Sequence, residues 1–139
     1  MSAKLLLSFL VVLAYPVMAQ EVVKQGVWET IDYDVQGAWK IVRTGDTYTV
    51  RLGEDFETKD GPDLHILLSP RSIKEIDHGD AGNDALIVGP LNTTDTSTFF
   101  KKMKGPQSLA LPSGVNLSEY KTILIHCVKF SHLWAGGTL

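Results

Sequence analysis

Short apolar runs alternate with polar positions along most of the chain, and turn residues separate them at intervals of roughly 8–12 residues. The clearest example is a hairpin predicted from Ala38–Arg43 to Thr47–Leu52, with Gly45 in the turn. Alternate residues of its second strand are apolar, which is typical of an antiparallel strand with one buried face. We therefore expect a half-buried antiparallel sheet in this region.

Further apolar runs predict strands in the rest of the chain, at Leu64–Ser69, Ala85–Val88, Gln107–Leu111 and Tyr120–Phe130. The last of these is the longest. The segment Thr98–Met103 fits either one turn of helix or a further strand. No long helical period occurs after residue 36. The pattern predicts an all-β fold, an antiparallel β-sandwich or a barrel-like single domain.

The first 19 residues have the pattern of a cleavable secretory signal peptide. Lys4 precedes an apolar run from Leu5 to Ala14, and Val17 and Ala19 occupy the −3 and −1 positions of a cleavage site. This run of about ten residues is too short for a transmembrane anchor, because spanning a bilayer takes roughly 20 residues. We expect an exported chain, periplasmic or extracellular, with no transmembrane anchor after cleavage.

The residues after the predicted cleavage site suit one domain. We expect a lead-in segment over residues 20–36 and a β domain over residues 37–139. The chain has 13 Lys and Arg against 16 Asp and Glu, and a formal net charge of −3. Nucleic-acid binding needs a clustered positive field, so no nucleic-acid partner is expected.

Cys127 is the single cysteine, so the chain cannot form an internal disulfide. In an oxidising compartment such a thiol is buried and inert, joined to another chain, or functional. Strand alternation places Cys127 on the same face as Ile123 and Ile125. The same alternation places His126 on the opposite face. Cys127 and His126 therefore cannot bind one metal together unless a β-bulge intervenes.

His132 lies beyond the expected end of the last strand and could fold back toward Cys127. A cysteine with a nearby histidine is half of a blue-copper site, for which Met103 and His65 are further candidates. Haem bound without a covalent link, through the thiolate or a histidine, is a second alternative. Covalent haem attachment is excluded, because the chain has no Cys-x-x-Cys-His motif. The cofactor is unknown at this stage, with haem and copper both open.

Other catalytic or metal-binding motifs are missing from the sequence. It contains no Gly-x-Ser-x-Gly, no phosphate-binding loop and no His-Glu-x-x-His, so a hydrolase has no support. The acidic stretch Asp77–Asp84 lacks the ligand spacing of an EF-hand. We interpret it as a polar loop.

Three blocks of residues resemble the DM-thirteen (electron-transfer) domain family. The blocks are Leu52–Phe56 with Gly61–Leu64 leading into Leu67–Ser69, then Gly105, Gln107 and Leu111–Pro112, and finally Tyr120–Phe130 with Gly136–Leu139. The resemblance runs from about Gly37 to the C-terminus. It implies a β-sandwich-like extracytoplasmic domain with a redox role centred on Cys127, acting as a bare thiol or as a ligand to a group such as haem.

Two departures from the family concern the candidate site. Members usually have an aromatic residue where this chain has His126, and an apolar residue near the position of His132. If the family's mechanism uses an apolar pocket around the cysteine, His126 and His132 make that pocket more polar. They would then either impair the redox role of the cysteine or tune it.

The sequence supports two hypotheses. The first is an exported redox or electron-transfer domain in which Cys127 is the working residue, His126 or His132 is a proton partner or ligand, and the redox partner is unknown. The alternative is a non-enzymatic extracytoplasmic interaction module with a buried structural cysteine. In that module Gly61–Leu64 and the loop His78–Asp84 would shape a binding edge. An intermolecular disulfide through Cys127 is a third possibility.

Overall fold

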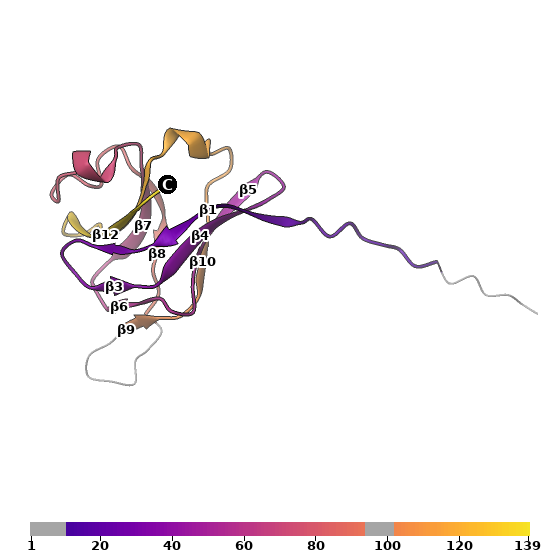
Figure 1. Cartoon of the computed structure of the whole chain (residues 1–139), viewed down its shortest axis with the longest axis horizontal. Coiled ribbons are helices and arrows are strands. Elements are labelled where there is room, and N and C mark those ends of the chain that lie inside the picture. Colours follow the sequence, from indigo (N-terminus) through magenta and orange to yellow (C-terminus); the bar gives the residue numbers. More distant parts are fainter. Residues whose placement is uncertain (1–10, 94–101) are drawn as a thin grey trace, which may run out of the picture.

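The computed structural model describes residues 11–93 and 102–139 of the chain (Figure 1). In these ranges the regular structure is β-strand, apart from two short 3₁₀ helices, η1 (Ile73–Glu75) and η2 (Leu117–Glu119). The strands are β1 (Gln20–Val27), β2 (Glu29–Thr30), β3 (Val35–Gln36), β4 (Ala38–Thr44), β5 (Thr47–Leu52), β6 (Glu57–Lys59), β7 (Leu64–Ser69), β8 (Leu86–Pro90), β9 (Lys102–Lys104), β10 (Gln107–Ala110), β11 (Thr122–Cys127) and β12 (His132–Thr138).

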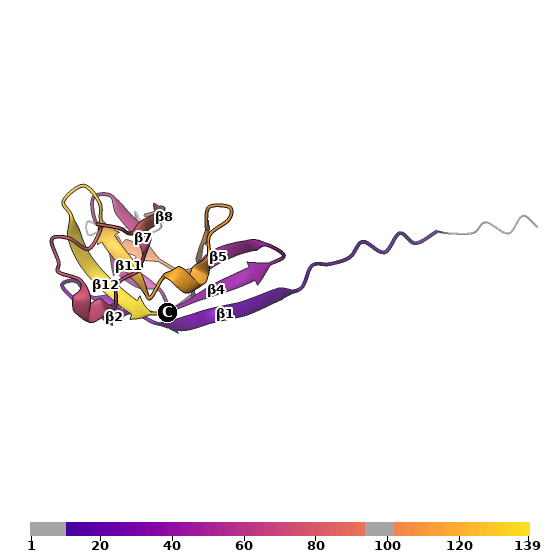
Figure 2. The same cartoon turned by 90° about the horizontal axis from the view of Figure 1, so that it is seen from above.

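The strands form three sheets, with the orders β1-β4-β5-β10, β2-β12-β11-β7-β8 and β3-β6-β9. All the pairings are antiparallel. Figure 2 shows β1, β4 and β5 as one layer, beside the layer that contains β12, β11 and β7. The prediction of an all-β antiparallel fold is confirmed. The described strands close into no barrel, so the barrel-like alternative is not supported.

The local predictions that depend on period-two alternation are confirmed. The hairpin of β4 and β5 turns at Gly45, whose φ of 59° is readily adopted by glycine. In β5, Val50 and Leu52 are buried in the main core. Strand β7 has the predicted bounds, and β8 and β10 lie within two residues of theirs. The strand alternative for Thr98–Met103 holds for Lys102 and Met103 in β9, and residues 94–101 lie outside the described part of the chain.

The prediction of one long closing strand over Tyr120–Phe130 is wrong. Strand β11 ends at Cys127, and the chain reverses through Ser131, which has a φ of 49°. It then returns as β12, antiparallel to β11. The sequence pattern missed β12 because its Ala-Gly-Gly stretch has low β-propensity and no polar alternation.

The predicted lead-in over residues 20–36 is part of the folded domain. It contributes β1, which pairs with β4 except at a register shift between Val22 and Lys24, and the short strands β2 and β3. The sequence of this segment did not predict these strands. Strand β1 lies at the edge of the four-stranded sheet and most of its side chains are exposed, so it shows no alternation of apolar and polar residues. No helix in the described part of the chain is long and apolar enough to cross a membrane.

The five-stranded sheet is buried on both faces. On one face Ile66 and Ile125 belong to the main core, which also contains Trp39 and Ile41 of the four-stranded sheet. On the other face a smaller cluster packs beneath the loop after η1; its buried members are Leu67, Ile76, Ala81, Leu124 and Leu133. Burial on both faces explains why β7 and β11 read as nearly continuous apolar runs.

Candidate functional site

Cys127 is the last residue of β11, and a tight turn of the chain holds its thiol. The Sγ atom donates a hydrogen bond to the carbonyl oxygen of Pro62, at 2.8 Å. The next carbonyl, of Asp63, accepts a hydrogen bond from the backbone N–H of Val128 at 3.1 Å. The thiol side chain is buried, with 2% of the residue exposed. The Gly61–Leu64 motif therefore binds the end of β11 on both sides of the cysteine.

A β-bulge in β12 places a histidine opposite this cysteine. The register between β11 and β12 shifts between Ile125 and His126. Trp134 is the extra residue of β12, with no paired residue in β11. Past the bulge, Cys127 pairs with His132. A one-residue shift moves later side chains to the other face of a strand, and directly paired residues project from the same face. The bulge therefore brings His132 to the face of Cys127.

Cys127 and His132 line a small surface hollow of about 220 Å³, together with Tyr33, Pro62, Phe130 and Trp134. The rings of Tyr33 and Trp134 are stacked, with centroids 4.2 Å apart. The ring of Tyr33 also meets His132 edge-on at 5.6 Å. Phe130 is 64% exposed and lies at the rim. The thiol therefore lies at the base of a mostly aromatic hollow that reaches the surface.

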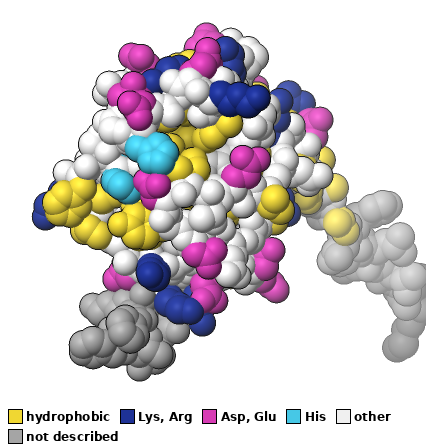
Figure 3. All heavy atoms as spheres, turned by 60° about the vertical axis from the view of Figure 1, so that its left-hand side comes forward, with side chains coloured by type: hydrophobic (Ala, Val, Ile, Leu, Met, Phe, Trp, Pro, Cys, Tyr) yellow, Lys and Arg dark blue, Asp and Glu magenta, His cyan; other side chains and the backbone are white. Residues whose placement is uncertain are grey.

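A carboxylate beside the hollow contacts two imidazoles. Asp32, in the turn between β2 and β3, accepts a hydrogen bond at Oδ2 from Nδ1 of His78, at 2.7 Å. The Nε2 atom of His132 lies 2.9 Å from the same oxygen. On the face shown in Figure 3, histidine and acidic side chains gather next to a hydrophobic patch. A carboxylate and two imidazoles therefore lie together beside the hollow.

His126 lies on the other face of the sheet from Cys127, as strand alternation predicts. It is 2% exposed, and a Cβ on Gly82 would come within 3.2 Å of its Nε2 atom. Its Nδ1 atom is buried with no hydrogen-bond partner in the described part of the chain. Burial lowers the pKa of His126, and the charges of His132 and His65 lower it further. His126 is therefore neutral near pH 7 and does not share the hollow with the thiol.

The low pKa of His126 predicts that the domain loses stability as the pH falls. The unfolded histidine binds its proton at about pH 6.5, whereas the folded one resists protonation. Stability is therefore fully present above about pH 6.5 and is lost below it, by up to about 1.4 kcal/mol per pH unit for one proton. Urea unfolding between pH 5 and pH 8 should show this slope, and His126→Leu should flatten it. An equal slope in the variant would assign the effect to other groups.

The cofactors suggested by the sequence do not fit these residues. Within residues 11–93 and 102–139, no group of three or more His, Cys, Asp or Glu side chains is arranged to hold a metal ion. His65 is the cross-strand partner of His126 and not of Cys127, and Met103 belongs to the core in β9. A hollow of about 220 Å³ is also smaller than the roughly 300–1,000 Å³ of ordinary small-molecule sites, so it has no room for haem.

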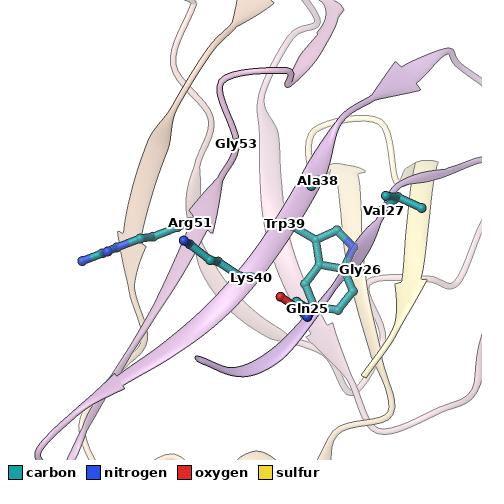
Figure 4. A pocket seen from close by; sticks show the side chains of 8 residues that line it. All are labelled: Gln25, Gly26, Val27, Ala38, Trp39, Lys40, Arg51 and Gly53. Atoms are coloured by element: carbon teal, nitrogen blue, oxygen red, sulfur yellow. The ribbon is translucent and has the colours of Figure 1, made fainter. Parts of the chain in front are cut away.

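A second hollow, of about 520 Å³, lies between β1, β4 and β5 (Figure 4). Its lining includes Trp39 and Gly26, and the side chains of Lys40 and Arg51 point away from the indole ring. The lining contains neither a thiol nor an imidazole. The thiol of Cys127 and the imidazole of His132 line the smaller hollow instead.

The sequence indicated Cys127 and His132 as candidates but gave no indication of the residues that surround them in the hollow. Asp32 and His78 come from two distant loops, and no local pattern connects either loop to the cysteine. The one available signal was the Gly61–Leu64 motif, which resembles the family and which contacts Cys127 in the structure.

The family model described as "Electron transfer DM13" matches residues 29–135. The match includes all the residues that line the hollow, together with Asp32 and His78. It begins before Gly37, where the visible resemblance starts. No curated protein and no solved structure matches the chain.

Proposed function

The chain belongs to the electron-transfer DM13 family, and on that premise we propose that it is an exported redox domain whose Cys127 exchanges electrons with a disulfide-bearing partner. The observation that carries this proposal is the hollow, which the buried thiol of the single cysteine lines together with His132. A cysteine that served only to fill the core would require neither of two features seen here. One is the bulge that brings His132 to the face of Cys127, and the other is the exposed aromatic ring of Phe130 at the rim.

The chemistry follows from the presence of one cysteine. The Cys127 thiol loses its proton to a base, and the thiolate attacks one sulfur of the partner disulfide. The partner S–S bond breaks, a mixed disulfide forms, and the other partner sulfur leaves as a thiolate. The Cys127 sulfur is oxidised and the leaving sulfur is reduced by the same amount. Because the chain has no second cysteine, release requires a thiol from another molecule.

Export is supported by where the first strand begins. Strand β1 starts at Gln20, the residue that follows the predicted cleavage site, whereas residues 11–19 form no regular structure and are exposed. Removal of the signal peptide would therefore leave the sheets intact. We expect the protein from the exported fraction to begin at Gln20.

The proposal predicts a reversible mixed disulfide on the folded protein. The exported chain is incubated with oxidised glutathione, and intact mass is recorded before and after dithiothreitol. We expect one glutathione per chain, removed by the reductant, and none on Cys127→Ser. The absence of an adduct on the folded wild-type protein would reject the proposal in favour of the binding-module alternative.

Variants at the rim show whether the reaction uses the hollow. Phe130→Ala removes the exposed ring beside the thiol and is expected to speed adduct formation several-fold. The matched control is Ile87→Ala in β8, which removes a 49% exposed apolar side chain that does not line the hollow. The control should react at the wild-type rate. Equal rates in all three proteins would mean that access does not pass Phe130.

A further inference from the structure

The two imidazoles that contact Asp32 differ in their relation to the thiol. His132 lines the hollow and pairs with Cys127 across the strands. His78 contacts the same carboxylate oxygen from the loop after η1 and does not line the hollow. One carboxylate therefore contacts a histidine beside the cysteine and a second histidine away from it.

The contact with Asp32 determines which nitrogen of His132 carries the proton. Nε2 of His132 lies 2.9 Å from a carboxylate oxygen of Asp32, so the negative charge of Asp32 favours a proton on this nitrogen. In the neutral ring Nδ1 is then the basic nitrogen. In the described part of the chain, Nδ1 has no hydrogen-bond partner. The contact with Asp32 therefore favours the tautomer of His132 that can accept a proton at Nδ1.

We propose that Asp32 is a positioning residue that holds His132 as the proton acceptor for the Cys127 thiol. This inference rests on the proposed function, because it names the base that the exchange reaction requires. The proton passes from Sγ of Cys127 to Nδ1 of His132, and Asp32 stabilises the resulting imidazolium. The thiolate that remains is the nucleophile. The hydrogen bond from Sγ to Pro62 is broken in this step.

The charged and titratable groups around His132 come from four segments of the chain. They are Asp32 and Tyr33 from the β2–β3 turn, His78 from the loop after η1, Asp63 and His65 from the start of β7, and Cys127, His126 and Lys129 from β11 and the turn after it. Asp32 is the only carboxylate of this set that contacts His132 in the described part of the chain. The charge on His126 is suppressed by burial, so it contributes little between pH 6 and pH 8.

The test is the pH profile of thiol reactivity in the full exported chain. The rate of reaction with a small aromatic disulfide reagent is measured from about pH 5 to pH 9, on both sides of the ordinary titration of free cysteine at about 8.5. Asp32→Asn and His132→Gln should move the midpoint of the profile upward by about one pH unit or more. His78→Gln, which removes the other imidazole from the same oxygen, should leave the midpoint unchanged.

A second measurement covers the case in which Asp32→Asn does not fold. The histidine titrations are followed by NMR in the wild-type protein and in Cys127→Ser. The midpoint of His132 should differ between the two proteins, and that of His78 should be the same. Titrations of His132 that coincide would overturn the proposal, as would a His78→Gln profile that moves as far as that of His132→Gln.

Different results would reject the proposed function and the role of Asp32. A folded wild-type thiol that reacts at no pH would reject the proposed function, and this inference with it. A thiol that reacts with the same profile in wild type, Asp32→Asn and His132→Gln would reject the role of Asp32 alone.

Discussion

Trp39→Ala is expected to lower the free energy of unfolding by about 3–5 kcal/mol, the range for deleting a large buried aromatic side chain. Trp39 is 2% exposed, in β4. A Cβ on Gly26 of β1, or on Gly137 of β12, would come within 2.7 Å of its indole. The ring therefore packs against strands of both larger sheets, and its loss leaves a cavity where they meet. Trp28 lies next to it, with centroids 6.2 Å apart.

The matched variant is Trp39→Phe, which keeps an aromatic ring at this position. The indole Nε1 atom is buried without a hydrogen-bond partner in the described part of the chain, so its removal exposes no unsatisfied group. We expect Trp39→Phe to cost clearly less than Trp39→Ala. In thermal unfolding, Trp39→Ala should lower Tm by more than about 10 °C. A loss of less than about 1 kcal/mol would show that this ring does not hold the sheets together.

Gly61→Ala is expected to destabilise the domain by about 1–3 kcal/mol through overpacking, and to change the reactivity of Cys127. A Cβ at Gly61 would lie 2.7 Å from two ring atoms of Trp134 and 3.1 Å from Cγ of Leu64. The Trp134 ring must then move, and that ring lines the hollow. The same turn supplies the Pro62 carbonyl that accepts the hydrogen bond from the thiol.

The control for this substitution is Gly79→Ala, at a glycine where an added Cβ meets nothing within 4 Å. It should stay within about 0.5 kcal/mol of wild type, as most surface substitutions do. Urea unfolding gives the stabilities, and the rate with a small aromatic disulfide reagent gives the reactivities. Wild-type behaviour of Gly61→Ala in both measurements would mean that the turn tolerates the clash and does not shape the hollow.

The parts of the fold that sequence predicts well are those determined by local alternation. The β4–β5 hairpin, β7 and the opposite orientations of Cys127 and His126 all follow from period two and turn chemistry. Strands β1 and β12 were missed, because an exposed edge strand and a glycine-rich strand show no such alternation. Their pairing depends on partners far away in the chain.

The candidate site was predictable only in part, for the same reason. Cysteine and histidine chemistry drew attention to Cys127 and His132, but the bulge at Trp134 that brings them together has no sequence signal. The contact of Asp32 with two histidines joins three separate segments, so no spacing along the chain indicates it. The Gly61–Leu64 motif was visible as part of the family resemblance, and its contact with the thiol emerges only from the fold.

We propose that Cys127 reacts from within the folded domain. The most direct test is the rate of its reaction with a small disulfide at increasing urea concentrations below the unfolding transition. The account predicts a measurable rate that does not depend on urea, because the thiol is reached through the hollow by the native state. A rate that rises with urea in parallel with global unfolding would show a buried structural cysteine and would contradict the account.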